Sequence, residues 1–145
     1  MGLTKLQEFT NNALDSLQSL ALLLIRLILA YGFYEPAMNK FSDISSVAAW
    51  FGSMEIPLPT LNAYMAAGTE LAGVILLTLG IFTRYISFPL MVIMLVAIGT
   101  VHLQNGFSAG SNGFEIPLYY LLMLFVLASH GGGKYSLDNL WLKRV

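Results

Sequence analysis

Long apolar runs separated by short polar stretches dominate the chain and predict membrane-spanning helices. A helix needs about 20 apolar residues to cross a hydrocarbon core of roughly 30 Å. Four stretches meet or approach that length, and they cover residues 17–38, 61–82, 86–102 and 114–130. We therefore predict an all-α fold, an integral membrane four-helix bundle that forms a single domain over residues 1–145.

Both ends of the chain show a different, amphipathic pattern. Over residues 3–16, leucine and alanine recur at roughly helical spacing among polar and charged residues, which is typical of a helix lying in the membrane interface. Near the other end, three glycines at 131–133 stop a helix, and Ser136 can cap a short helix over residues 136–144. We expect an interfacial helix at each end of the bundle.

The composition favours a membrane protein over a soluble one. Apolar residues make up 57% and charged residues 10% of the chain, whereas an average soluble domain has about 45–50% and about 25%. A chain of 145 residues cannot bury that much apolar surface in a core of its own. The net charge of −1 leaves no basic field for nucleic acid, and the lack of cysteine excludes disulfides and thiolate metal sites.

The basic residues indicate how the bundle lies in the membrane, since lysine and arginine concentrate in cytoplasmic loops. With four spans, both termini share one side. The other side holds Lys40 alone. The shared side holds five basic residues, which places both termini in the cytoplasm: Lys5, Arg84, Lys134, Lys143 and Arg144.

Arg26 and Glu70 lie inside predicted spans and need a physical reason, because an intramembrane charge costs about 2.5–3.5 kcal/mol on insertion scales. Counted from the outer ends of their spans at about 1.5 Å per residue, they lie roughly 18 Å and 13–14 Å deep. That similarity predicts a buried ion pair between them. Such a pair either clamps two spans together or helps to hold a ligand or relay a proton.

Polar side chains converge on the outer half of the predicted bundle, and every span contributes at least one. Each also has a structural explanation: His102 can cap a helix, Glu115 suits a helix N-terminus, and Tyr119 suits an aromatic belt. Their convergence nevertheless predicts a polar cavity. The candidate ligand-binding residues are Arg26, Glu70, His102, Glu115, Tyr119 and Lys40.

A metal site is a weaker hypothesis. Thioether and imidazole ligands suit Cu(I), but methionine is also an ordinary packing residue in an apolar bundle. The sequence contains no paired-histidine zinc motif, phosphate loop or nucleophile elbow. We therefore predict no metal, and the weak candidates are Met38, Met54, Met65 and His102.

Several short motifs follow one another over about residues 20–140. They are the Leu-Leu-Ile-Arg-Leu run at 23–27, Lys40-Phe41, Glu70-Leu-Ala-Gly followed by the turn at 79–84, His102 with Glu115, and Gly-Gly-Gly-Lys-Tyr-Ser-Leu-Asp at 131–138. As an ordered set they resemble the DoxX family of small bacterial membrane proteins, which includes the small subunit of thiosulfate:quinone oxidoreductase. Ala37 and Gly132 depart from the family pattern, and both bear only on local turns.

The resemblance implies a multi-pass protein of the bacterial inner (plasma) membrane that is associated with oxidoreductase systems, without fixing a reaction. Because the chain carries no cysteine pair or haem motif, electron transfer would need a diffusible quinone or a partner subunit. Three functions stay open at this stage. They are a redox subunit that holds a quinone or small polar ligand in the outward half of the bundle, a non-catalytic anchor or assembly factor for a partner protein, and a small permease acting as a homo-oligomer.

Overall fold

The computed structural model describes residues 3–142, with side chains described for residues 7–141. Within this part of the chain every regular element is helical, which confirms the predicted all-α class. Short π and 3₁₀ turns η1 (Ile98–His102), η2 (Leu103–Asn105) and η3 (Ala109–Ser111) lie between α4 and α5. The α-helices are α1 (Leu3–Ser42), α2 (Ile44–Ser53), α3 (Pro59–Leu79), α4 (Thr83–Ala97), α5 (Glu115–His130) and α6 (Leu137–Leu142).

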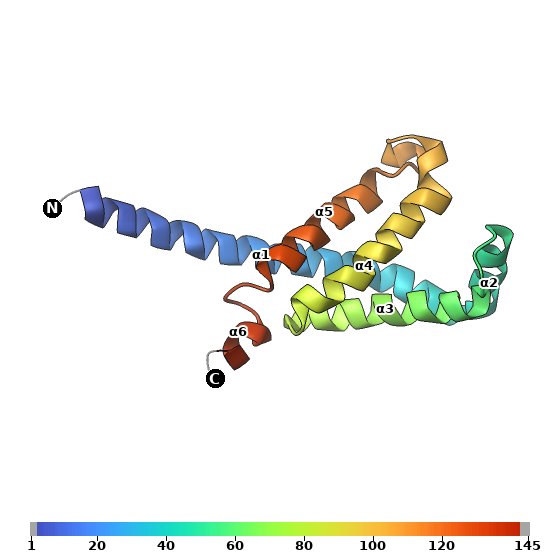
Figure 1. Cartoon of the computed structure of the whole chain (residues 1–145), viewed down its shortest axis with the longest axis horizontal. Coiled ribbons are helices and arrows are strands. Elements are labelled where there is room, and N and C mark those ends of the chain that lie inside the picture. The colour runs from blue at the N-terminus through green and yellow to red at the C-terminus, as the bar shows by residue number, and fades with distance from the viewer. Residues whose placement is uncertain (1–2, 143–145) are drawn as a thin grey trace.

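The first helix is continuous over 40 residues. The segment 3–16, predicted as an interfacial helix leading into the first span, forms the first turns of α1 without a break and projects beyond the bundle (Figure 1). Its location in the membrane interface stays a prediction. No glycine or proline interrupts the helix near residue 16, and the Ser16 and Ser19 hydroxyls donate to carbonyls four residues earlier. At the other end, α6 lies within the predicted 136–144 helix, of which residues 143 and 144 are outside the described residues.

Three helical segments are long and apolar enough to cross a membrane: Gln7–Ser42, Pro59–Leu79 and Thr83–Asn105. The fourth predicted span corresponds to α5, which is apolar but has only 16 residues. The chain after α5 returns to the end of the bundle where α4 begins, because Asp138 bonds to the first residues of α4. This return favours a membrane crossing by α5, which stays a prediction.

The helices pack as two antiparallel pairs that diverge from a common end (Figure 1). In one pair α1 lies along α3, and in the other α4 lies along α5. The pairs meet where α3 turns into α4, which we call the narrow end of the bundle. At the opposite, wide end α2 leads into α3, and α4 leads into the turns η1 to η3.

The turn at the narrow end is fixed by two left-handed residues and one carboxylate. Gly80 and Phe82 adopt φ values of +70° and +49°. The Asp138 carboxylate accepts hydrogen bonds from the backbone amides of Phe82 (2.9 Å) and Thr83 (3.1 Å), which satisfies two free amides of the α4 N-terminus. Because of this cap, α4 begins three residues earlier than predicted, and Pro89 lies inside the helix.

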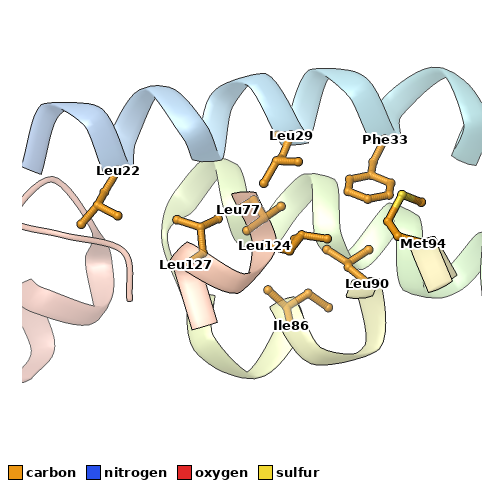
Figure 2. Close-up of a cluster of buried hydrophobic side chains, with 10 residues drawn as sticks. Leu22, Leu29, Phe33, Leu77, Ile86, Leu90, Met94, Leu124 and Leu127 are labelled. Atoms are coloured by element: carbon orange, nitrogen blue, oxygen red, sulfur yellow. The ribbon is translucent and has the colours of Figure 1, made fainter. Parts of the chain in front are cut away.

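The hydrophobic core lies toward the narrow end (Figure 2). Leu29 and Phe33 of α1 pack with Leu77 of α3, Leu90 of α4 and Leu124 of α5, and all five side chains are fully or almost fully buried. Lipid tails are as apolar as these side chains, so close van der Waals packing rather than exclusion of water stabilises such a core in a bilayer. The core holds the two helix pairs together at the narrow end and leaves the wide end free to splay.

The segment 39–60, between the first two predicted spans, contains the helix α2, which sequence reasoning missed. Asp43 caps it by accepting from the Ser46 amide at 3.1 Å. Hydrogen bonds from the Ser46 hydroxyl and amide and from the Ser45 hydroxyl hold the pKa of Asp43 below its usual value. An aspartate directly before an apolar run is a helix-start signal, so the sequence did contain the cue.

Candidate functional site

A buried ion pair joins α1 to α3 at the wide end. The Lys40 ammonium lies 2.9 Å and 2.8 Å from the two Glu70 carboxylate oxygens. Glu70 is 2% exposed, and Lys40 is half-buried. Ala37 of α1 and Ala67 of α3 are fully buried beside the pair, and small residues of this kind let two helices approach closely.

This geometry corrects the predicted Arg26–Glu70 pair. Arg26 lies level with Gly80, since a Cβ atom on that glycine would overlap the Arg26 guanidinium. Glu70 precedes Gly80 by ten residues, or about 15 Å along the helix, which is beyond the reach of the arginine. The depth count failed because it assumed that the outer ends of the two spans lie level. Lys40, two residues before the end of α1, instead meets Glu70, eleven residues after the start of α3.

Arg26 belongs to a second cluster at the narrow end, which we call the C-terminal clasp: Arg26, Gly132, Tyr135 and Asp138. The Arg26 guanidinium donates to the carbonyl oxygens of Gly132 (2.8 Å) and Tyr135 (3.1 Å). Arg26 is 1% exposed, and its Nε atom has no hydrogen-bond partner among the described residues. Arg26 therefore fastens the chain end to α1 and does not line the cavity described next.

A cavity of about 990 Å³ lies at the wide end, between the two helix pairs and beside α2. Its walls are mainly apolar. Apart from one histidine, Lys40 and Glu70 are the only acidic or basic residues among the described lining residues. Prolines from three helices also face it: Pro36, Pro89 and Pro117. The other polar residues that line it are Asn62, Thr69, Thr100, His102, Asn112 and Tyr120.

His102 reaches the cavity because the end of α4 widens into a π-helical turn, η1. The Nδ1 atom of His102 lies 2.9 Å from the carbonyl oxygen of Asn112, so this carbonyl orients the ring when Nδ1 carries the proton. In the same turn the Thr100 hydroxyl donates to the Val96 carbonyl at 2.7 Å. Single π turns often occur at functional sites, and this one brings a proton-exchanging group to an apolar cavity.

Glu115 and Tyr119, both predicted to bind the ligand, lie four residues apart on α5 and do not line the cavity. The Tyr119 hydroxyl donates to one Glu115 oxygen at 3.1 Å, and the Ala109 amide donates to the other at 2.8 Å. The two residues therefore order the connection between α4 and α5. Of the six predicted ligand-binding residues, the structure brings Lys40, Glu70 and His102 together around the cavity.

Tyr120 is a cavity residue that sequence reasoning missed. Its ring packs edge-on against Phe33 with centroids 5.5 Å apart, and its hydroxyl lies against Gly32, where any side chain would overlap it. The spacing contained a signal for this position. Tyr120 falls in one helical stripe with the buried Pro117, Leu124 and Leu127, whereas Tyr119 does not.

The weak metal candidates are only partly gathered. Met54 and Met65 line the cavity together with His102, and Met38 does not. Among the described residues no group of three or more histidine, cysteine, aspartate and glutamate side chains could hold a metal ion.

The chain is similar to a known protein family and to several known proteins. The DoxX family model matches residues 21–103. Two Haemophilus influenzae relatives, both named only "Uncharacterized protein", are 32% identical (86% of this chain, 85% of the relative) and 31% identical (92% and 99%). A Bacillus subtilis protein named "Putative oxidoreductase CatD" is 33% identical over 80% of this chain and 83% of its own length. No solved structure matches the chain.

Proposed function

The chain belongs to the DoxX family and is a membrane protein, and on that premise we propose that its cavity holds the head of a quinone as part of a redox system. The observation that carries the proposal is the cavity itself, with the Lys40–Glu70 pair in a mainly apolar wall. Ligand sites of this kind combine apolar walls with a few polar groups that fix orientation. The oxidoreductase name of the Bacillus subtilis relative agrees with a redox setting.

A quinone head suits these residues chemically. Its ring is apolar, so it fits walls built from proline, valine and methionine, and its carbonyl oxygens accept hydrogen bonds. The Lys40 ammonium can donate to one carbonyl while Glu70 keeps its charge compensated. When bound, a quinone supplies two-electron chemistry that also takes up two protons, and His102 at the cavity can exchange protons. The electrons come from a partner protein in this proposal.

Trp50 offers a direct test, because it lines the cavity and the chain has only one other tryptophan, Trp141. In a Trp141→Phe background, titration of nanodisc-embedded protein with a short-chain ubiquinone should quench the remaining fluorescence in a saturable way. His102→Ala should weaken binding by about five- to tenfold, which is the effect of losing one hydrogen bond of about 1 kcal/mol.

His130 provides the matched control, because it is the second histidine of the chain and bonds within the last turn of α5, away from the cavity. His130→Ala should leave the titration unchanged. Quenching that rises linearly without saturation, or equal effects of the two histidine variants, would contradict quinone binding in this cavity.

A second candidate function rests on the projecting first turns of α1. Residues 7–18 are all exposed, and they extend past the rest of the bundle (Figure 1). A helix that protrudes in this way favours the anchoring of a partner protein. Copurification of a stoichiometric partner that is lost when residues 3–16 are deleted, together with an unsaturable quinone titration, would place this function first.

We also propose that the narrow end faces the cytoplasm of a bacterial inner membrane. Arg84 and Lys134 lie at that end, whereas Lys40 at the wide end is engaged by Glu70. The positive-inside rule then predicts that a green fluorescent protein fused after residue 145 is fluorescent in cells. Alkaline phosphatase should be active when inserted after Gly110 and inactive at the C-terminus, and the reverse pattern would invert the topology.

A further inference from the structure

The cavity is open on one flank of the bundle, between α3 and α4. These helices touch near the narrow end, where Leu90 packs against Gly73 so closely that a Cβ there would lie 2.8 Å from a leucine methyl. Beyond that contact the helices diverge (Figure 1). Met65 of α3 and Val92 and Val96 of α4 line the cavity and are still 59%, 58% and 47% exposed, so they form the rim of an opening.

This opening faces lipid rather than water if α3 and α4 cross the membrane. α3 and the helical segment Thr83–Asn105, which begins with α4, are long and apolar enough to do so, and the rim residues lie within them. On the opposite flank, between α1 and α5, the Tyr120 hydroxyl lies directly against Gly32 and narrows the space between the two helices. A second hollow of about 500 Å³ on the outer side of this contact shares both residues with the cavity.

We propose that ligands enter and leave the cavity sideways from the bilayer, through the opening between α3 and α4. The ligand class is then a membrane-dissolved molecule with a polar head and an apolar tail. The head lies toward the Lys40–Glu70 pair, and the tail leaves between Met65 and Val96 into the lipid. This inference rests on the proposed function for the nature of the head, but the route depends only on the rim.

The rim suits this role chemically. Valine and methionine at the entrance offer a water-soluble ligand no favourable contacts. An alkyl or isoprenoid tail, in contrast, packs against these side chains about as favourably as against lipid tails. Methionine is flexible, so Met65 can adapt to tails of different shape. The polar groups lie behind the rim, which means that the head must pass an apolar threshold before it can be bound.

The absence of cysteine from the sequence permits a test that needs no ligand. Thr69→Cys places one thiol in the cavity wall behind the rim, which we call the wall thiol. In reconstituted liposomes, the rate of labelling by a bilayer-dissolved pyrene maleimide reports access from lipid. Val96→Trp should plug the opening and slow this labelling at least tenfold, whereas Leu95→Trp, at an exposed neighbour that does not line the cavity, should change it less than twofold.

Two further measurements keep the result unambiguous. Ile75→Cys, an exposed position on α3 outside the lining, should label equally fast with and without Val96→Trp. Equal effects of the two tryptophan variants on labelling of the wall thiol overturn the proposal. So does labelling of the wall thiol by a charged, water-soluble thiosulfonate that exceeds labelling by the maleimide when each rate is divided by that reagent's rate with free cysteine in solution.

The quinone titration of the Trp141→Phe protein, in which Trp50 is the only tryptophan, separates this inference from the proposed function. Saturable quenching together with unslowed labelling of the wall thiol overturns the lateral opening alone. The opposite outcome is also informative. If Val96→Trp slows labelling, Leu95→Trp does not, and quenching is unsaturable, the opening is supported and only quinone binding is overturned.

Discussion

Arg26→Gln is expected to destabilise the detergent-solubilised protein by about 3 kcal/mol. Two hydrogen bonds from a charged donor to the carbonyls of Gly132 and Tyr135 are lost, each worth roughly 1.5–3 kcal/mol, and the buried Gly132 carbonyl stays without that donor. Arg26→Lys should recover little of this loss, because a point charge cannot reproduce the guanidinium fork that reaches both carbonyls. Thermal melting followed by circular dichroism measures the change.

The clasp also predicts where the structure loosens first. Trp141 lies on α6, so in a Trp50→Phe background its fluorescence reports release of the chain end. In Arg26→Gln that signal should change at a lower temperature than the circular dichroism does. Arg84→Gln, an exposed arginine at the same end of the bundle, is the control and should cost less than about 0.5 kcal/mol. Equal melting of the two glutamine variants would show that Arg26 does not hold the clasp.

The apolar runs predicted the helices well because helix length and hydropathy are local properties. Three of the four predicted spans lie over helical segments long enough to cross a membrane, and the fourth lies over the shorter α5. The ends were less predictable. The start of α4 depends on a carboxylate 55 residues away, Asp138, whose role no local pattern could show.

The partners of the intramembrane charges depend on relative helix position, which sequence does not give. Side chains on a helix lean toward its N-terminus. On α1 this directs Arg26 toward the narrow end and brings Lys40 back to Glu70. The sequence pointed to Arg26, Glu70 and Lys40 as important, but it could not align α1 against α3, because the sequence does not show which residues of the two helices lie level. The carbonyl partners of Arg26 carry no side-chain signature at all.

The Lys40–Glu70 pair is expected to show strong coupling in a double-mutant cycle. Glu70→Gln or Lys40→Met alone leaves one buried charge uncompensated, at a cost of about 3–5 kcal/mol. The double variant removes both charges and should cost clearly less than the sum of the single variants, since a neutral pair suits the apolar surroundings. Melting temperatures of the four proteins in one detergent give the coupling, and additive losses would show that the pair contributes no interaction of its own.

Glu35→Gln is the matched control, because Glu35 is an exposed carboxylate on the same helix and should change stability little. The double variant also separates two roles of the pair. If Lys40 and Glu70 only join α1 to α3, the double variant should bind the short-chain ubiquinone as tightly as the parent protein. We expect it to fold and yet bind at least tenfold more weakly, because the ammonium that orients the head is gone while the apolar walls remain.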